Sequence, residues 1–386
     1  MVGNQKIVQM LLEKDTNQNI QNNDGDTALI LAIIHNYQEI VEMLLDKGAN
    51  PNIQNNDGET TLHWAIYKDN QEIVEMLLDK GTNPDIKDNN GCTILHWAVT
   101  YNNPKIIQML LHKGANPDMQ NKDGSTPLMW AVESDSPKMV QILLDKGANP
   151  DIQSNSGYTA LHCVVTYNNP KIIQMLLDKG ANPDMQNKDG STPLMWAVES
   201  DSPEMVQILL DKGANLDIQD NNGDTALIWA VRYNNPKIMQ VLLDKGANPD
   251  IQDREGLTAL MPAVIYDYLE IVQMLLNKGA NPDIQDNDGL TALILAVIHN
   301  YLEIVEMLLD KGANPDIQNR EGLTALMSAV IYDDLEIVQI LLDKGANPDI
   351  QDNDGDTPLM LAIENKNQAI INLLMKRTTA LAVDRA

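Results

Sequence analysis

The chain has 386 residues, of which 27 are basic and 55 acidic, so its net charge at pH 7 is −28. This charge argues against binding nucleic acid, whose phosphates require a basic surface, and against binding anionic membranes. It favours a protein partner of basic or mixed charge. The two cysteines cannot form a disulfide framework, and there is no signal-peptide pattern or long apolar run. We expect a cytoplasmic protein, and we expect it to be a monomer.

The sequence repeats itself every 33 residues. A half repeat (1–23) precedes ten full repeats (24–353), a shortened C-terminal capping repeat (354–376) and a short tail (377–386). Punctuation by glycine and proline at fixed places in each unit is typical of repeat architectures. The units begin at Asp24, Asp57, Asn90, Asp123, Ser156, Asp189, Asn222, Glu255, Asp288, Glu321 and Asp354.

Each unit begins with a short predicted helix. In residues 189–221, Thr192 is a good N-cap, and Pro193 suits the first helical position because its missing N–H would be unpaired there. We expect this helix to end near Ser200. Asp201 then stands where the chain must turn, and the same place holds Asn or Asp in all ten full units. These are the non-glycine residues that best tolerate the left-handed conformation.

A second helix follows the turn in each unit. Pro203 is suited to begin it, and Lys212 and Gly213 are suited to end it. The residues that remain before the next unit are too few and too polar for a third helix. The sequence therefore predicts an all-α repeat solenoid of helix–turn–helix units joined by β-hairpin-like loops.

These units resemble the ankyrin repeat family, whose signature T-P-L-H-x-A stands here as "TTLHWA" (60–65), "TILHWA" (93–98) and "TPLMWA" (126–131 and 192–197). The resemblance covers about residues 4–376. It implies that first helices line a concave face and that the motif histidine hydrogen-bonds between neighbouring repeats. That histidine is kept only at His63, His96 and His162 and is elsewhere Met or Ile.

Metal and catalytic sites are not expected. The segment around Asp352, Asp354 and Gly355 looks like part of a calcium loop, but Ile350 and Leu361 stand where its first and last ligands belong. A zinc site at Cys92, His96 and His63 would need ligands about 10 Å apart to meet on one ion. No nucleophile–base pair or phosphate loop breaks the repeat, so we expect no cofactor and no enzyme activity.

All five tryptophans occupy one place on the first helix. In the unit at 189–221, Leu194, Ala197 and Val198 define the core face, and Trp196 lies nearly opposite. Two interpretations remain open: an aromatic row along the groove, or rings that pack against neighbouring helices.

The loop tips and the ends of the first helices vary most between units, and the resemblance implies that these places contact partners. Exposed aromatic and aliphatic side chains there are typical of interface hot spots. The candidate binding residues are Trp64, Tyr67, Trp97, Tyr101, Trp130, Tyr158, Tyr167, Trp196, Trp229, Arg232, Tyr233, Leu257, Tyr266, Leu290, His299, Leu323 and Tyr332.

The sequence thus predicts a non-catalytic scaffold that binds a protein partner through the concave face and loop tips. One alternative is a secreted effector of a symbiont, pathogen or virus that acts on host proteins. Another is a structural spacer or elastic solenoid with no specific partner.

Overall fold

The computed structural model describes residues 5–14 and 16–384, with side chains described as far as Lys376. Within these residues the fold is helical, and the only β pairing is an isolated bridge between Gln21 and Thr27. The chain divides into two compact units, Met1–Lys188 and Asp189–Ala386. The predicted all-α repeat solenoid is confirmed.

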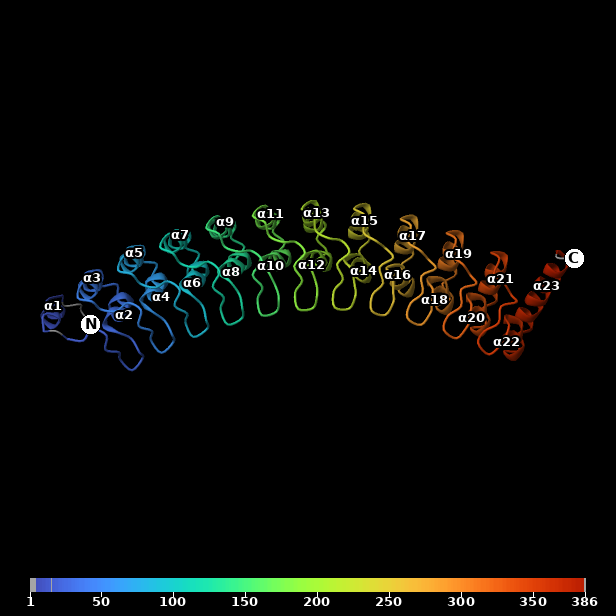
Figure 1. Cartoon of the computed structure of the whole chain (residues 1–386), viewed down its shortest axis with the longest axis horizontal. Helices are drawn as coiled ribbons and strands as arrows, with labels where there is room; N and C mark the ends of the chain where they lie inside the picture. Colours follow the sequence, from blue (N-terminus) through green and yellow to red (C-terminus); the bar gives the residue numbers. More distant parts are fainter. Residues whose placement is uncertain (1–4, 15, 385–386) are drawn as a thin grey trace. The chain divides into compact units, whose positions relative to one another are not determined.

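Each unit has two layers of short helices and a row of loops. Within a unit, the first helices of the repeats lie side by side, the second helices form the outer layer, and the loops project beyond the first helices (Figure 1). The helices of unit 1 are α1 (Gln5–Leu12), α2 (Ala28–Ile34), α3 (Gln38–Asp46), α4 (Thr61–Tyr67), α5 (Gln71–Asp79), α6 (Ile94–Thr100), α7 (Pro104–His112), α8 (Pro127–Glu133), α9 (Pro137–Asp145), α10 (Ala160–Tyr167) and α11 (Pro170–Asp178).

Unit 2 repeats the same arrangement and ends in a longer helix, α23, which continues through most of the segment predicted as a tail. The helices of unit 2 are α12 (Pro193–Glu199), α13 (Pro203–Asp211), α14 (Ala226–Arg232), α15 (Pro236–Asp244), α16 (Leu260–Ile265), α17 (Leu269–Asn277), α18 (Ala292–Ile298), α19 (Leu302–Asp310), α20 (Ala325–Ile331), α21 (Leu335–Asp343), α22 (Pro358–Glu364) and α23 (Gln368–Asp384).

The start and the end of the helices follow the predicted signals. The Thr192 hydroxyl accepts a hydrogen bond from the Met195 N–H, and Pro193 is the first residue of α12. Asp201 has φ of 47°, and its equivalents in all ten full repeats lie in the same left-handed region. The prediction that Asn or Asp makes this turn is confirmed.

The core lies between the two helix layers. In the second repeat, Leu62 and Ile66 of α4 face Val74 and Leu77 of α5, and all four are buried. Within each unit, neighbouring repeats also contact each other through equivalent helices, such as α4 with α6 and α16 with α18. A single 33-residue repeat cannot bury its apolar faces alone, so its stability comes from stacking on neighbouring repeats.

The loops are joined from repeat to repeat by backbone contacts. Gly58 has φ of +79°, and a Cβ at this position would lie 2.7 Å from the Asn89 amide nitrogen. Gln54 reaches across the same junction, where its Nε2 donates to the carbonyls of Gly58 (2.6 Å) and Lys87 (2.8 Å). A side chain at Gly58 would therefore clash with the next loop as well as strain its own backbone.

Candidate protein-binding surface

The tyrosines at the ends of the first helices form the exposed aromatic surface of each unit. Their side chains are between 42% and 57% exposed, and every exposed tyrosine of the described chain is a predicted binding residue. Arg232 and His299 occupy the same region and are also exposed. The exposed tyrosines are Tyr67, Tyr101 and Tyr167 in unit 1, and Tyr233, Tyr266 and Tyr332 in unit 2.

The tryptophans are half-buried rather than fully exposed. Trp97 packs edge to face on His63, with ring centroids 5.4 Å apart, and its Nε1 donates to Asp88 at 3.0 Å. Trp229 makes the equivalent bond to Asp220 at 3.1 Å. Each ring thus packs against the protein with one part and faces solvent with the other. The same half-buried state is found at Trp64, Trp97, Trp130, Trp196 and Trp229.

The predicted residues at the loop tips lie beside the first helices and are also half-buried: Tyr158, Leu257, Leu290 and Leu323. Tyr158 lies against His162, with ring centroids 5.8 Å apart. Within each unit, the exposed helix ends and the loop tips beside them are called the strip below.

The motif histidines hold the ends of the loops. His96 Nε2 lies 3.1 Å from the Ser125 carbonyl of the next repeat, which confirms the expected bond between repeats. His63 differs, because its Nε2 is buried without a hydrogen-bond partner. Its Nδ1 accepts from the Thr60 N–H at 3.0 Å, so the proton is on Nε2. Burial lowers the pKa of both His63 and His96 to about 4.

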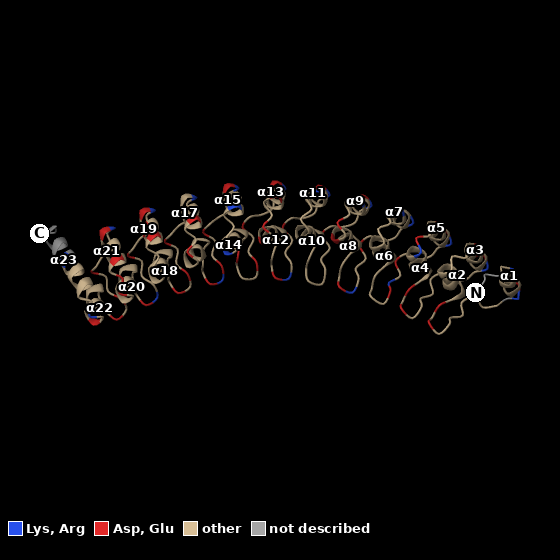
Figure 2. Ribbon diagram, turned by 180° about the vertical axis from the view of Figure 1, so that it is seen from behind, with Lys and Arg blue, Asp and Glu red and all other residues tan. Residues whose placement is uncertain are grey.

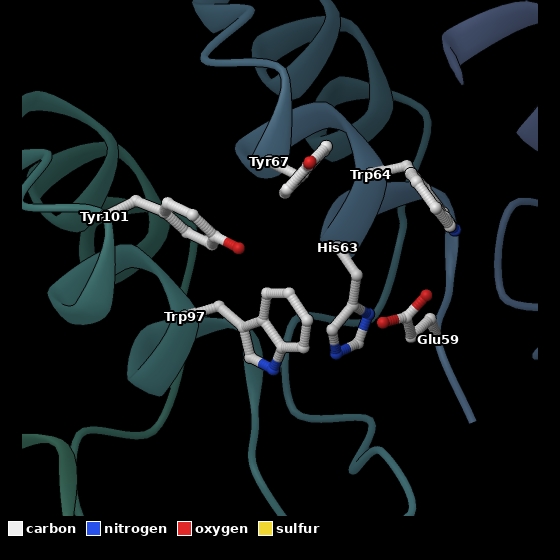
Figure 3. A pocket seen from close by; sticks show the side chains of 6 residues that line it. All are labelled: Glu59, His63, Trp64, Tyr67, Trp97 and Tyr101. Carbon is white, nitrogen blue, oxygen red and sulfur yellow. The ribbon is translucent and has the colours of Figure 1, made fainter. Parts of the chain in front are cut away.

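An aromatic pocket opens between the second and third repeats of unit 1. Its volume is about 280 Å³. Tyr67 lies edge to face against Tyr101, with ring centroids 5.8 Å apart, and Trp97 lies 5.9 Å from Tyr101. Figure 3 shows these rings around a common space, with Glu59 beside His63 and Trp64. The aromatic pocket is lined by Glu59, His63, Trp64, Tyr67, Trp97 and Tyr101.

Glu59 places a carboxylate in this pocket without a countercharge. One of its oxygens accepts a long hydrogen bond from Asn55 Nδ2 at 3.4 Å. Burial raises the pKa of Glu59, and the carboxylates of Asp57, Asp88 and Asp26 raise it further. Among the described residues, no lysine or arginine forms an ion pair with Glu59.

Trp64 Nε1 is a second buried donor without a partner. The bond that Trp97 makes to Asp88 has no equivalent here, since Asn55 stands at the place of Asp88. The Asn55 oxygen already accepts the backbone N–H groups of Glu59 (2.9 Å) and Asp57 (3.1 Å). Its amide nitrogen is what remains, and a nitrogen donor cannot accept from an indole N–H.

The equivalent place in unit 2 holds a built-in cation. Arg232 stands where unit 1 has Tyr67, and its Nη2 lies 3.1 Å from Asp224 and 3.0 Å from Asp253. Asp224 is the equivalent of Glu59, and Pro262 replaces Trp97. Despite Arg232, burial keeps the pKa of Asp224 above its usual value. In unit 2, Arg232 therefore pairs with the carboxylate of Asp224, whereas the equivalent carboxylate of Glu59 in unit 1 has no cationic partner among the described residues.

Sequence reasoning identified four of the six residues that line the aromatic pocket. It missed Glu59 and His63, because a single repeat considered by itself does not show which loop tip faces which helix of the next repeat. A signal was present: Glu59 is the only glutamate at its place in the repeat.

The described residues contain no group of three or more His, Cys, Asp or Glu side chains that could hold a metal ion. In the same part of the chain, no helix is both long and apolar enough to cross a bilayer.

Comparison with known proteins gives the family. A family model of ankyrin repeats, three copies long, matches residues 1–55, 48–121, 95–187, 179–253, 245–319 and 311–384. The crystal structure of the ankyrin repeat domain of Bcl-3, a member of the IkappaB protein family, is similar to 57% of this chain and to 99% of its own length, with 32% identity and a TM-score of 0.53. No curated protein matches. Ankyrin repeats are generally protein–protein interaction modules and non-catalytic scaffolds, and with matches along its whole length the chain belongs to the ankyrin repeat family.

Proposed function

We propose that the chain is a scaffold that binds a partner protein through the ends of its first helices and its loop tips. The observation that carries this proposal is the strip of exposed tyrosines, because tyrosine supplies a large contact area with few rotatable bonds and is enriched in interface hot spots. Half-buried tryptophans lie beside it. The strip lies on the first helices, which the family resemblance assigns to a concave face used for contacts.

The outer surface of the second helices is less suited to binding. It carries exposed ion pairs between neighbouring repeats, such as Lys80 with Asp46 at 2.7 Å and Lys245 with Asp211 at 2.8 Å. Exposed pairs of this kind are worth little, and they already satisfy each other's charge. The described second helices carry no exposed aromatic side chain.

The partner is expected to carry basic groups. Acidic residues lie on the loops and on the second helices of both units (Figure 2). A net charge of −28 speeds the approach of a basic protein and slows that of an acidic one.

The test replaces five tyrosines by the serine that stands at the same place in other repeats of this chain, as at Ser134 and Ser200. Partners captured by the wild-type chain under crosslinking should be lost from the variant, while its helical signal and melting remain unchanged. The substituted residues are Tyr101, Tyr167, Tyr233, Tyr266 and Tyr332.

The matched control removes exposed side chains from second helices, at Lys138, Lys171 and Lys237. It should keep every partner. If the tyrosine variant keeps its partners and the lysine variant loses them, the binding surface is the outer face and the proposal is wrong. A chain that captures no partner at all would favour a structural spacer.

A further inference from the structure

The aromatic pocket of unit 1 differs from the rest of the strip because it combines a cavity, several aromatic rings and an unpaired carboxylate. Ring faces and edges from two successive repeats surround it: Trp64 and Tyr67 from one, Trp97 and Tyr101 from the next (Figure 3). Trp64 and Tyr67 pack edge to face at 5.8 Å, which fixes their orientation before a ligand arrives. Pre-ordered rings reduce the entropic cost of binding.

Both the rings and the carboxylate favour a cation. The face of an aromatic ring is negative and attracts a cation, most strongly for tryptophan. Glu59 adds a formal charge among the carboxylates of Asp26, Asp57 and Asp88. Lys68 Nζ lies 5.4 Å from the centre of the Tyr67 ring, but Lys68 does not line the pocket.

Unit 2 shows that a cation fits at this place in the repeat. There the guanidinium of Arg232 lies between Asp224 and Asp253, whose equivalents in unit 1 are Glu59 and Asp88. In unit 1, Tyr67 stands in place of the arginine and Trp97 Nε1 already donates to Asp88, so the carboxylate of Glu59 is the one left for a cation supplied from outside.

The size of the pocket limits what can enter. About 280 Å³ is below the range of roughly 300–1,000 Å³ typical of pockets for drug-sized ligands. It suits one side chain of a partner protein. An unmodified lysine ammonium is strongly hydrated and costly to transfer among rings, whereas N-methyl groups reduce its hydration and contact the ring faces.

We propose that this aromatic pocket binds a methylated lysine side chain of the partner protein, with Glu59 accepting a hydrogen bond from the remaining N–H of the ammonium group. The inference rests on the proposed function, since the lysine must belong to a bound protein. A mono- or dimethylated lysine keeps a proton to donate to Glu59. A trimethylated lysine has none and loses the charge-assisted bond.

The full-length chain is titrated with three forms of the peptide Gly-Ser-Gly-Lys-Gly-Ser-Gly, in which the lysine is unmodified, dimethylated or trimethylated. The dimethyl form carries ¹³C in its N-methyl groups. We expect it to bind at least about tenfold more tightly than the unmodified form, which corresponds to about 1.4 kcal/mol. Its methyl resonances should shift upfield on binding, because they lie over aromatic rings.

The two tryptophan variants use a residue that occurs at the same place in other repeats of this chain, so that the repeat still folds. Trp97→Leu follows Leu31 and Leu295, and it should reduce binding at least about tenfold. Trp229→Leu is the matched control in unit 2 and should leave binding unchanged. Glu59→Gln keeps the shape of the side chain and should remove most of the preference for the dimethyl over the trimethyl peptide.

Each other outcome overturns the inference. Equal binding of unmodified and dimethylated peptides excludes recognition of the methyl groups. Absence of binding at millimolar peptide, or loss of binding in the Trp229→Leu control, excludes this pocket as the site. Choline is titrated as a further arm, and binding of choline as tight as that of the dimethyl peptide identifies a free small molecule as the ligand. In each case, capture of partners by the tyrosine strip is measured separately, so failure of the pocket is distinguishable from failure of the proposed function.

Discussion

Residues 57–101 of unit 1 and residues 222–266 of unit 2 occupy the same places in the repeat, but they differ in how they treat buried charge. In unit 2, Arg232 pairs with Asp224 and Asp253. In unit 1, Glu59 has no countercharge, and aromatic rings surround the space beside it. The two regions share the same order of helices and turns, although α16 begins one residue later in its repeat than α6, and they differ mainly in a few side chains.

The comparison shows that ankyrin repeats can close or open a site with the same order of helices and the same turns. Substitution of Tyr67 by Arg and of Trp97 by Pro separates the open place from the closed one. The turns are kept in both, since Asp69 and Asn234 have φ values of 52° and 51°. The caps differ, because Thr93 and His96 form a capping box at the start of α6, whereas α16 has no side-chain cap bond. Function can therefore vary through a few side chains at fixed places in the repeat.

The largest expected effect concerns acid stability, which should separate the two units. Burial lowers the pKa of His63 and His96 to about 4, whereas the unfolded chain protonates them near 6.5. Between these two values the unfolded state binds protons that the folded state cannot, so stability falls as the pH falls from 6.5 to 4. The loss is about 3 kcal/mol for each histidine. Their equivalents in unit 2, Ile228 and Met261, do not titrate.

The double variant His63→Met with His96→Met should lose less stability than wild type when urea denaturation is compared at pH 7 and pH 4.5. Methionine fits this place, since Met195 occupies it in α12. Ile228→Met supplies the control, because it places methionine at the equivalent of His63 in unit 2 without removing a titratable group, and it should not change the pH response. An unchanged response in the double variant would show that carboxylates alone cause the acid sensitivity.

The second-largest expected effect comes from removing the cation that pairs with Asp224 and Asp253 in unit 2. In Arg232→Met, Asp224 and Asp253 stay buried without a cation, and we expect unit 2 to lose about 2 kcal/mol, a value reduced because the arginine is itself partly exposed. Hydrogen exchange of α14 and α16 measures this loss locally. The loss should shrink at lower pH, because protonation of Asp224 removes the uncompensated charge.

Tyr67→Met is the matched control for Arg232→Met, since it removes a side chain at the equivalent place without breaking an ion pair. It should change hydrogen exchange in α4 and α6 by less than Arg232→Met changes it in unit 2. Equal effects in the two units would show that the arginine acts through packing rather than through its charge.

Most of the fold could be predicted because the residues that cap the helices and make the turns recur at the same places in ten full repeats. The caps and left-handed turns, as at Thr192 and Asp201, depend on local backbone preferences and were predicted correctly. The bond from His96 to Ser125 was expected from the family resemblance rather than from local chemistry.

The candidate site was harder to predict, because it depends on contacts between neighbouring repeats within unit 1. Tyr67 and Tyr101 were identified from their place on the helix, but their meeting across two repeats with Glu59 is a property of stacking. The half-buried state of the tryptophans also could not be derived from helical periodicity. The angle around a helix gives the direction of a side chain and not the depth of its neighbours.

The smallest expected effect on stability makes the sharpest test of the comparison. Tyr67→Arg places a guanidinium eight residues after Glu59 and 21 before Asp88, the same spacing that joins Arg232 to Asp224 and Asp253. The new side chain should pair with Glu59, lower the pKa of that carboxyl and raise stability by at most about 1 kcal/mol, since one end of the pair remains in contact with solvent. Because the arginine fills the aromatic pocket, the dimethyl-lysine peptide should no longer bind.

The ¹³C resonance of the Glu59 carboxyl, followed during acid titration, reports the pKa, and peptide titration reports the binding. A variant that lowers the pKa of Glu59 and still binds the peptide would show that the cation of unit 2 and the ligand of unit 1 occupy different places, and the equivalence of the two sites would be lost.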